Sequence, residues 1–232
     1  MSEEGGQTFL DHLEDLRRRL LRALIALVVG TVVSSLFAKR MLEWMARPVG
    51  GLQRLEAIEV TENLGVFMRA TLLGGVTLAM PVIVYQLWRF INPALEPSER
   101  RYVFLLVPLA TALFVSGAAF AYFVMLPAAV PFLLEFLSIP TRPRPANYVS
   151  FITSLMLWLG ISFETPLVIF FLAKVKVVNH RTLAQSWRTA IILIAVLAAV
   201  VTPTGDPVNM GLMMAPLIVL YGLSILLARI AQ

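Results

Sequence analysis

The length of the uncharged runs constrains the fold of this chain more than any other feature. From Tyr102 to Leu134 there is no Asp, Glu, Lys or Arg, and a helix over that run would reach about 50 Å at roughly 1.5 Å per residue. A bilayer core is only about 30 Å thick. Of the 232 residues, 59% are hydrophobic and 14% charged, whereas a soluble domain is about 45–50% apolar and about 25% charged. The sequence therefore predicts an all-α integral membrane protein and excludes soluble, disordered, collagen and coiled-coil folds.

Polar and proline-containing segments divide the apolar sequence into six predicted transmembrane helices in one membrane domain. An amphipathic helix from Thr8 to Arg19 should continue into the first span. The third span should end near Pro127, with the residues up to 137 along the interface. The fifth and sixth helices should be short, and internal prolines should bend several spans into a curved bundle. The single polytopic domain covers residues 1–232, with helices at approximately 20–37, 70–88, 102–126, 148–173, 189–203 and 209–228.

The distribution of Lys and Arg predicts the orientation. No basic start followed by a short apolar core resembles a cleavable signal peptide, so we expect the first span to remain as a signal anchor. With a cytoplasmic N-terminus, about twelve of the 19 Lys and Arg residues lie on the inner side and about seven outside, as the positive-inside rule favours. The prediction is a multi-pass protein of the cytoplasmic membrane with both termini in the cytoplasm.

The same residues argue against several functions. The net charge of +5 follows from basic cytoplasmic loops and does not indicate nucleic-acid binding, because no basic stretch is interleaved with aromatic residues. There is no cysteine, which excludes disulfides and thiolate metal sites. His12 and His180 lie in polar segments and no H-E-x-x-H motif occurs. We therefore expect that the protein is not an enzyme and that it binds no cofactor or metal. A transporter or channel for a small solute remains the alternative that composition alone favours.

Glu164 is the clearest functional candidate that follows from physical chemistry. It lies inside the predicted fourth span, where an ionisable side chain is costly unless it faces water or a partner. Pro166, two residues later, should free a backbone carbonyl and bend the helix. The structural alternative is a hydrogen bond from Glu164 to another helix.

Four stretches in order along the chain resemble a known family. The longest runs from Pro81 to Arg101 (PVIVYQLWRFINPALEPSERR), and the others are HLEDLRRRL from His12, SFETP from Ser162 and TPTGD from Thr202. Together they resemble TatC, the multispanning subunit of the twin-arginine protein translocase. The resemblance covers essentially the whole chain, and it implies a six-helix, glove-like protein with both termini cytoplasmic.

The resemblance also implies a function. TatC proteins receive signal peptides with two consecutive arginines and form the core of a translocase that exports folded proteins with the proton-motive force. The implied partners are the single-span proteins TatA and TatB, the signal peptides, membrane lipid and further copies of the chain in a receptor complex. The implied signal-peptide-binding residues are Glu99, Asp15, Arg17 and Phe90, with Glu164 functional inside the membrane and Pro48 and Asp206 functional on the periplasmic side.

The chemistry of an arginine pair agrees with acidic acceptors, since a guanidinium pairs best with a carboxylate. The alternative for Asp15 and Glu99 is that they are solvated acids balancing the neighbouring arginines, and Phe90 is either an interfacial anchor or a wall for the peptide. Asp15 stands where the family commonly has Glu. Met210 stands where the sixth helix of the family often has Gln, which leaves any polar role there to Asn209 or to no residue.

Overall fold

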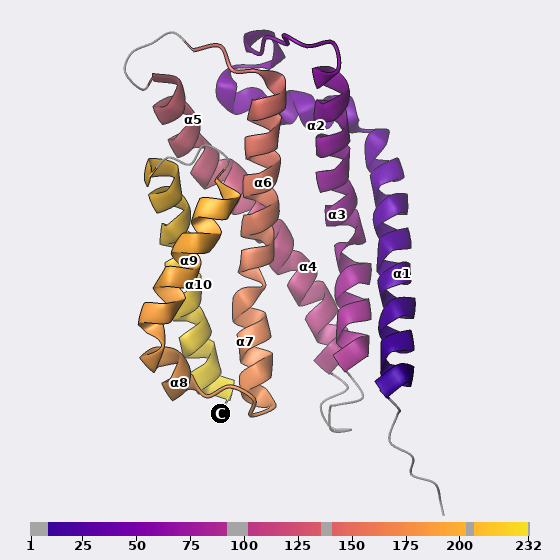
Figure 1. Cartoon of the computed structure of the whole chain (residues 1–232), viewed down its shortest axis with the longest axis vertical. Helices are drawn as coiled ribbons and strands as arrows, with labels where there is room; N and C mark the ends of the chain where they lie inside the picture. The colour runs from indigo at the N-terminus through magenta and orange to yellow at the C-terminus, as the bar shows by residue number, and fades with distance from the viewer. Residues whose placement is uncertain (1–8, 92–101, 136–140, 203–206, 232) are drawn as a thin grey trace, which may run out of the picture.

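A computed structural model describes residues 9–91, 102–135, 141–202 and 207–231. The described residues form helices joined by turns and short extended segments, and none of them forms a strand. Figure 1 shows the helices running between two ends of an elongated bundle, with α1 beginning at one end and α2 lying across the other. The elements are α1 (Phe9–Ser35), α2 (Ala38–Met45), η1 (Arg47–Val49), η2 (Leu52–Arg54), α3 (Glu62–Ile91), α4 (Tyr102–Phe120), η4 (Ala121–Met125), α5 (Leu126–Glu135), α6 (Pro145–Phe163), α7 (Thr165–Lys174), α8 (His180–Gln185), α9 (Trp187–Val201) and α10 (Pro207–Ala231).

The apolar helices agree with the predicted fold class. Four are long and apolar enough to cross a membrane, and a fifth candidate is formed by α1 with the segment that follows it, the two being bent by 79°. The helix Trp187–Val201 is apolar but shorter. The all-α membrane fold is therefore confirmed, and the number of apolar helices is consistent with six. The four long spans are Glu62–Phe90, Leu105–Glu135, Pro145–Lys174 and Pro207–Ala231.

Two predicted details of the helices were wrong. The third span does not end near Pro127, because the chain continues through the π-helical turn η4 into α5, as far as Glu135. A π-turn shifts the hydrogen-bond register within a continuous helix, and π-turns and prolines kink such a helix without ending it. The sixth helix is not short either: α10 has 25 residues, and only α9, with 15, is short.

The closest helix contact joins α1 to α3, which lie side by side in Figure 1. A side chain on Gly30 would meet the carbonyl oxygen of Gly75 at 2.7 Å. A side chain on Gly75 would collide with the Thr31 hydroxyl and would lie 2.8 Å from the Thr31 backbone nitrogen. Ser34 and Gly74 form the next contact in the same way. Small residues let two transmembrane helices approach closely, and this contact fixes the register of the α1–α3 seam.

The buried core lies between α3, α4 and α6 and extends to the end of the bundle that carries α2. The Trp44 ring stacks on Tyr122 with 3.5 Å between ring centroids. The Tyr122 hydroxyl donates to the backbone oxygen of Trp44 at 2.7 Å, and the Tyr148 hydroxyl donates to that of Met45 at 3.0 Å. These contacts hold α2 against η4 and α6. By contrast, α10 contacts mainly α7 and α9, and most of its surface is not buried within the bundle.

We expect Gly75→Ala to destabilise the protein. The added methyl group would have no space against Thr31, and overpacking typically costs about 1–3 kcal/mol. Gly65→Ala on the same helix is the matched control, because nothing lies within 4 Å of its added carbon, and replacing a helical glycine should stabilise by up to about 1 kcal/mol. Thermal unfolding of both variants in detergent tests this. Equal midpoints for the two variants would contradict the proposed role of the crossing.

Candidate functional site

One stripe of α1 faces α3 along the whole seam. The positions Asp15, Arg19, Ala23, Gly30 and Ser34 are buried or half-buried, and their spacing in multiples of about three or four residues puts them on one helix face. The residues between them are mostly exposed. The N-terminal end of this stripe carries the charged pair, so an acid and a base lie at the seam rather than on the outer surface of α1.

Asp15 and Arg19 form an ion pair one helical turn apart. The Arg19 Nε donates to Asp15 Oδ2 at 2.6 Å. The side chain of Asp15 is 34% exposed, whereas that of Arg19 is only 13% exposed. The carboxylate therefore has one face open at the end of the bundle while the guanidinium is largely covered.

The register of the seam places Phe90 at the level of Asp15. The separation in sequence between Asp15 and Gly30 equals that between Gly75 and Phe90. Because α1 and α3 run in opposite directions (Figure 1), these equal separations put Asp15 and Phe90 at the same level. Phe90 is half-buried and Arg17 is exposed. The structure thus brings Asp15 and Phe90 to one end of the seam, while Arg17 points away from the stripe. Glu99 lies outside the described residues.

Glu164 lies at the break between α6 and α7 and lines an apolar groove. It is the last residue before α7, whose first turn contains Pro166, so the proline coincides with the break as its chemistry requires. The groove has a cavity volume of about 630 Å³, and its lining includes Trp88 of α3 and Phe171 of α7. Glu164 Oε1 is buried, and it has no hydrogen-bond partner among the described residues. For this oxygen the structural alternative, a hydrogen bond to another helix, is not observed.

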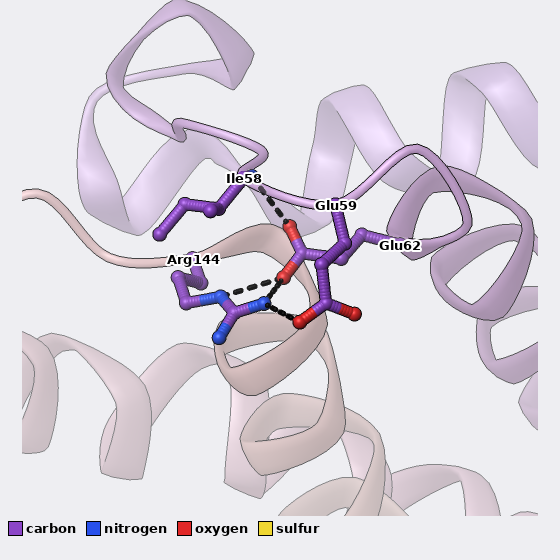
Figure 2. Close-up of polar contacts among 4 residues, drawn as sticks. All are labelled: Ile58, Glu59, Glu62 and Arg144. Carbon is purple, nitrogen blue, oxygen red and sulfur yellow. Dashed lines mark hydrogen bonds and ion pairs between the residues drawn. The ribbon is translucent and has the colours of Figure 1, made fainter.

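The opposite end of the bundle holds a charged cluster that joins two loops (Figure 2). Arg144, just before α6, donates from Nε to Glu62 Oε1 at 2.6 Å and from Nη2 to Glu59 Oε1 at 2.9 Å, and Nη2 also contacts Glu62. The Glu62 side chain is only 3% exposed, and Glu62 Oε2 accepts from the Ile58 backbone N–H at 3.1 Å. The hydrogen bonds to Glu59 and Glu62 raise the pKa of Arg144. Pro48 is half-buried in η1 at this same end, whereas Asp206 lies outside the described residues.

The comparisons with known proteins decide the family. The model of the family described as "Sec-independent protein translocase protein (TatC)" matches residues 11–216. The chain belongs to the TatC family. The TatC of Deinococcus radiodurans is 37% identical, with 98% of this chain and 88% of that protein covered, and the TatC of Carboxydothermus hydrogenoformans is 34% identical, with 98% and 95% covered. A solved structure, "Crystal Structure of Twin Arginine Translocase Receptor- TatC", is 36% identical, with a TM-score of 0.85 and 95% of this chain and 99% of that chain covered.

Membership in the TatC family confirms the predicted resemblance and class. The chain is a membrane component of the Sec-independent, twin-arginine protein translocase, and this family is not a family of enzymes. The described residues hold no group of three or more His, Cys, Asp or Glu that is suited to a metal.

Sequence reasoning missed Arg19, Gln86 and the Glu59–Glu62–Arg144 cluster. In the sequence, Arg19 is only one of the basic residues whose distribution predicts the orientation, and its burial depends on the α1–α3 crossing. For Arg144, a useful signal was its position between two prolines at the start of a span, because a cation is unfavourable at a helix N-terminus unless acidic groups pair with it.

We expect Arg144→Gln to loosen this end of the TatC bundle. The substitution would leave the covered Glu62 carboxylate without its cation, and removing one partner of a buried pair is strongly destabilising. Arg142→Gln is the matched control, because Arg142 pairs with Glu56 at 3.2 Å while both side chains remain exposed, and exposed pairs contribute little. Proteolysis of residues 50–62 at native temperature should increase in the first variant alone. Equal protection of both variants would show that the cluster does not hold the loops.

Proposed function

We propose that this chain is the receptor for twin-arginine signal peptides and the core subunit of a translocase that exports folded proteins with the proton-motive force. The observation that carries the proposal is the half-exposed Asp15 carboxylate at the end of the α1–α3 seam, level with Phe90. The solved TatC relative is named as a twin-arginine translocase receptor. A guanidinium is the group that such a carboxylate binds best.

The proposal places this end of the seam in the cytoplasm, together with both termini. The supporting observation is the excess of Lys and Arg on the segments assigned to the inner side, as the positive-inside rule favours. In this orientation Asp15 lies before the first span and Glu99 before the third, and we propose that the two form an acidic pocket with Phe90 as its apolar wall. Arg17, exposed on another face of α1, is assigned to the same surface by resemblance to the family.

Glu164 is proposed to receive a polar group from a partner helix. Its buried Oε1, which has no hydrogen-bond partner in the part of the chain that the structure describes, lies in a groove that is otherwise apolar. A polar contact inside a membrane favours helix association. The expected partners are TatA and TatB, with further copies of this chain and lipid around them. Pro48 and Asp206 are proposed to act on the periplasmic side.

We expect Glu99→Ala to weaken the binding of a twin-arginine signal peptide more than the binding of a matched twin-lysine peptide. A charge-assisted hydrogen bond contributes about 1.5–3 kcal/mol, so its loss should weaken binding about tenfold or more. Lysine cannot form the forked contact and has less to lose. Asp15→Asn should reduce the affinity for the twin-arginine peptide less than Glu99→Ala does, and Asp15→Glu should leave this affinity nearly unchanged. Peptide affinity for the detergent-solubilised protein measures this, and photocrosslinks from positions 89–101 report contact directly. Equal weakening of both peptides would contradict specific recognition at Glu99.

We expect Glu164→Ala to fold normally but to impair export in cells. The loss of a hydrogen bond to this carboxyl group, about 0.5–1.5 kcal/mol, should weaken partner association about two- to tenfold. Glu43→Ala is the control, since Glu43 is an exposed carboxylate on α2 and its removal should leave export unchanged. Export of a folded reporter gives the measurement. Full export by Glu164→Ala would remove the functional role from this residue.

A further inference from the structure

Arg19 differs from the other basic residues at the start of α1 because it is covered. Arg18 pairs with Glu14 at 3.4 Å, with both side chains more than 60% exposed. Arg19 pairs with Asp15 at 2.6 Å and is only 13% exposed. A covered guanidinium on the proposed ligand-binding carboxylate is therefore part of the site, whereas the Arg18 pair is an ordinary surface pair.

Two buried polar atoms lie unpaired at the same level of the seam. Arg19 Nη1 and Gln86 Oε1 are both buried, and neither has a hydrogen-bond partner among the described residues. The separation in sequence between Arg19 and Gly30 equals that between Gly75 and Gln86. Because α1 and α3 are antiparallel and cross at the two glycines, Arg19 and Gln86 lie at the same level. Gln86 is 9% exposed and shares a helix face with Gly75 and Ala79. One atom is a donor and the other an acceptor, and leaving such groups unpaired is unfavourable.

We propose that Arg19 sets the arginine specificity of the site by occupying Asp15 until a ligand replaces it, and that Gln86 then accepts the released guanidinium. This inference rests on the proposed function, because the ligand is the arginine pair of a signal peptide. Arg19 is a positioning residue: it acts through Asp15 and need not touch the peptide. Asp15 and Gln86 are the two acceptors between which its side chain moves.

The specificity follows from what each ligand can replace. An incoming arginine substitutes one guanidinium–carboxylate contact for another of the same kind, so the exchange costs little. A lysine offers a single compact ammonium and cannot reproduce the planar, forked contact that it displaces. Competition from Arg19 for Asp15 therefore lowers the affinity for a twin-lysine peptide more than the affinity for a twin-arginine peptide. Specificity is the difference between these two affinities.

The charges indicate the direction of the effect. While Arg19 is bound, its charge offsets that of Asp15 and reduces the attraction of the site for any cationic peptide. With a neutral residue at position 19, both peptides should bind more tightly, and the twin-lysine peptide should gain more. The ratio of the twin-lysine to the twin-arginine Kd should therefore fall, which a purely structural role of Arg19 would not produce.

The experiment measures the Kd of matched twin-arginine and twin-lysine signal peptides on the full-length protein in lipid nanodiscs. For Arg19→Gln we expect the ratio of the two Kd values to fall several-fold, with Arg19→Lys in between. Arg18→Gln, which makes the same charge change at an exposed pair, should leave the ratio unchanged. Gln86→Leu alone should weaken the binding of the twin-arginine peptide. In a double variant with Arg19→Gln it should have no further effect on this binding, because the effects of coupled residues are not additive.

The outcomes separate this inference from the proposed function. If the unmodified protein binds both peptides equally, the proposed receptor function fails. If it prefers the twin-arginine peptide, and Arg19→Gln keeps the original ratio or weakens both peptides equally, the role of Arg19 is wrong while the receptor function stands. Should Arg19→Gln fail to fold, Arg19→Lys and Gln86→Leu decide. An unchanged ratio for Arg19→Lys together with an unchanged twin-arginine Kd for Gln86→Leu overturns the inference.

Discussion

The close contact between α1 and α3 is the constraint on which the proposed recognition site depends. Gly30 and Gly75 meet where no side chain fits, and this single crossing sets the relative register of two long antiparallel helices. This register determines which residue of α1 lies opposite which residue of α3 along the whole seam. Asp15 comes level with Phe90 and Arg19 with Gln86, although these residues are far apart in sequence. In a bilayer, where apolar burial contributes little between helices, such backbone proximity is the main source of register.

The α1–α3 seam also explains how α1 carries a charged pair near its N-terminal end. Arg19 follows Asp15 by one turn, so the pair can form within α1 before α3 packs against it. Packing then covers the guanidinium and leaves the acid half-exposed. The opposite end of the bundle uses charge differently, because Arg144 precedes α6 whereas Glu62 begins α3, and their contact joins segments that meet only in the folded protein.

Much of the fold follows from apolar run length, and the parts that were missed have two causes. Run length and charge placement predicted the membrane class and the number of apolar helices, and Glu164 with Pro166 marked a real break between α6 and α7. The end of the third span was misplaced because a proline in the first turn of α5 is compatible with a helix. The burial of Arg19 and Gln86 was not predictable, because it depends on register between helices, and a single sequence contains no direct signal of register.

The two parts of the candidate site differ in what they can recognise. At the seam, the acceptor is an ion pair whose carboxylate is open at one side, so a ligand there must compete with an internal cation. At Glu164, the buried oxygen has no competing group among the described residues, and the surrounding groove is apolar. The first arrangement suits discrimination between two cations, because the competitor sets a threshold. The second suits association with a partner helix, since any polar group of the right reach satisfies the oxygen. Recognition of the peptide and assembly of the translocase would then rest on different chemistry at different depths of the same bundle.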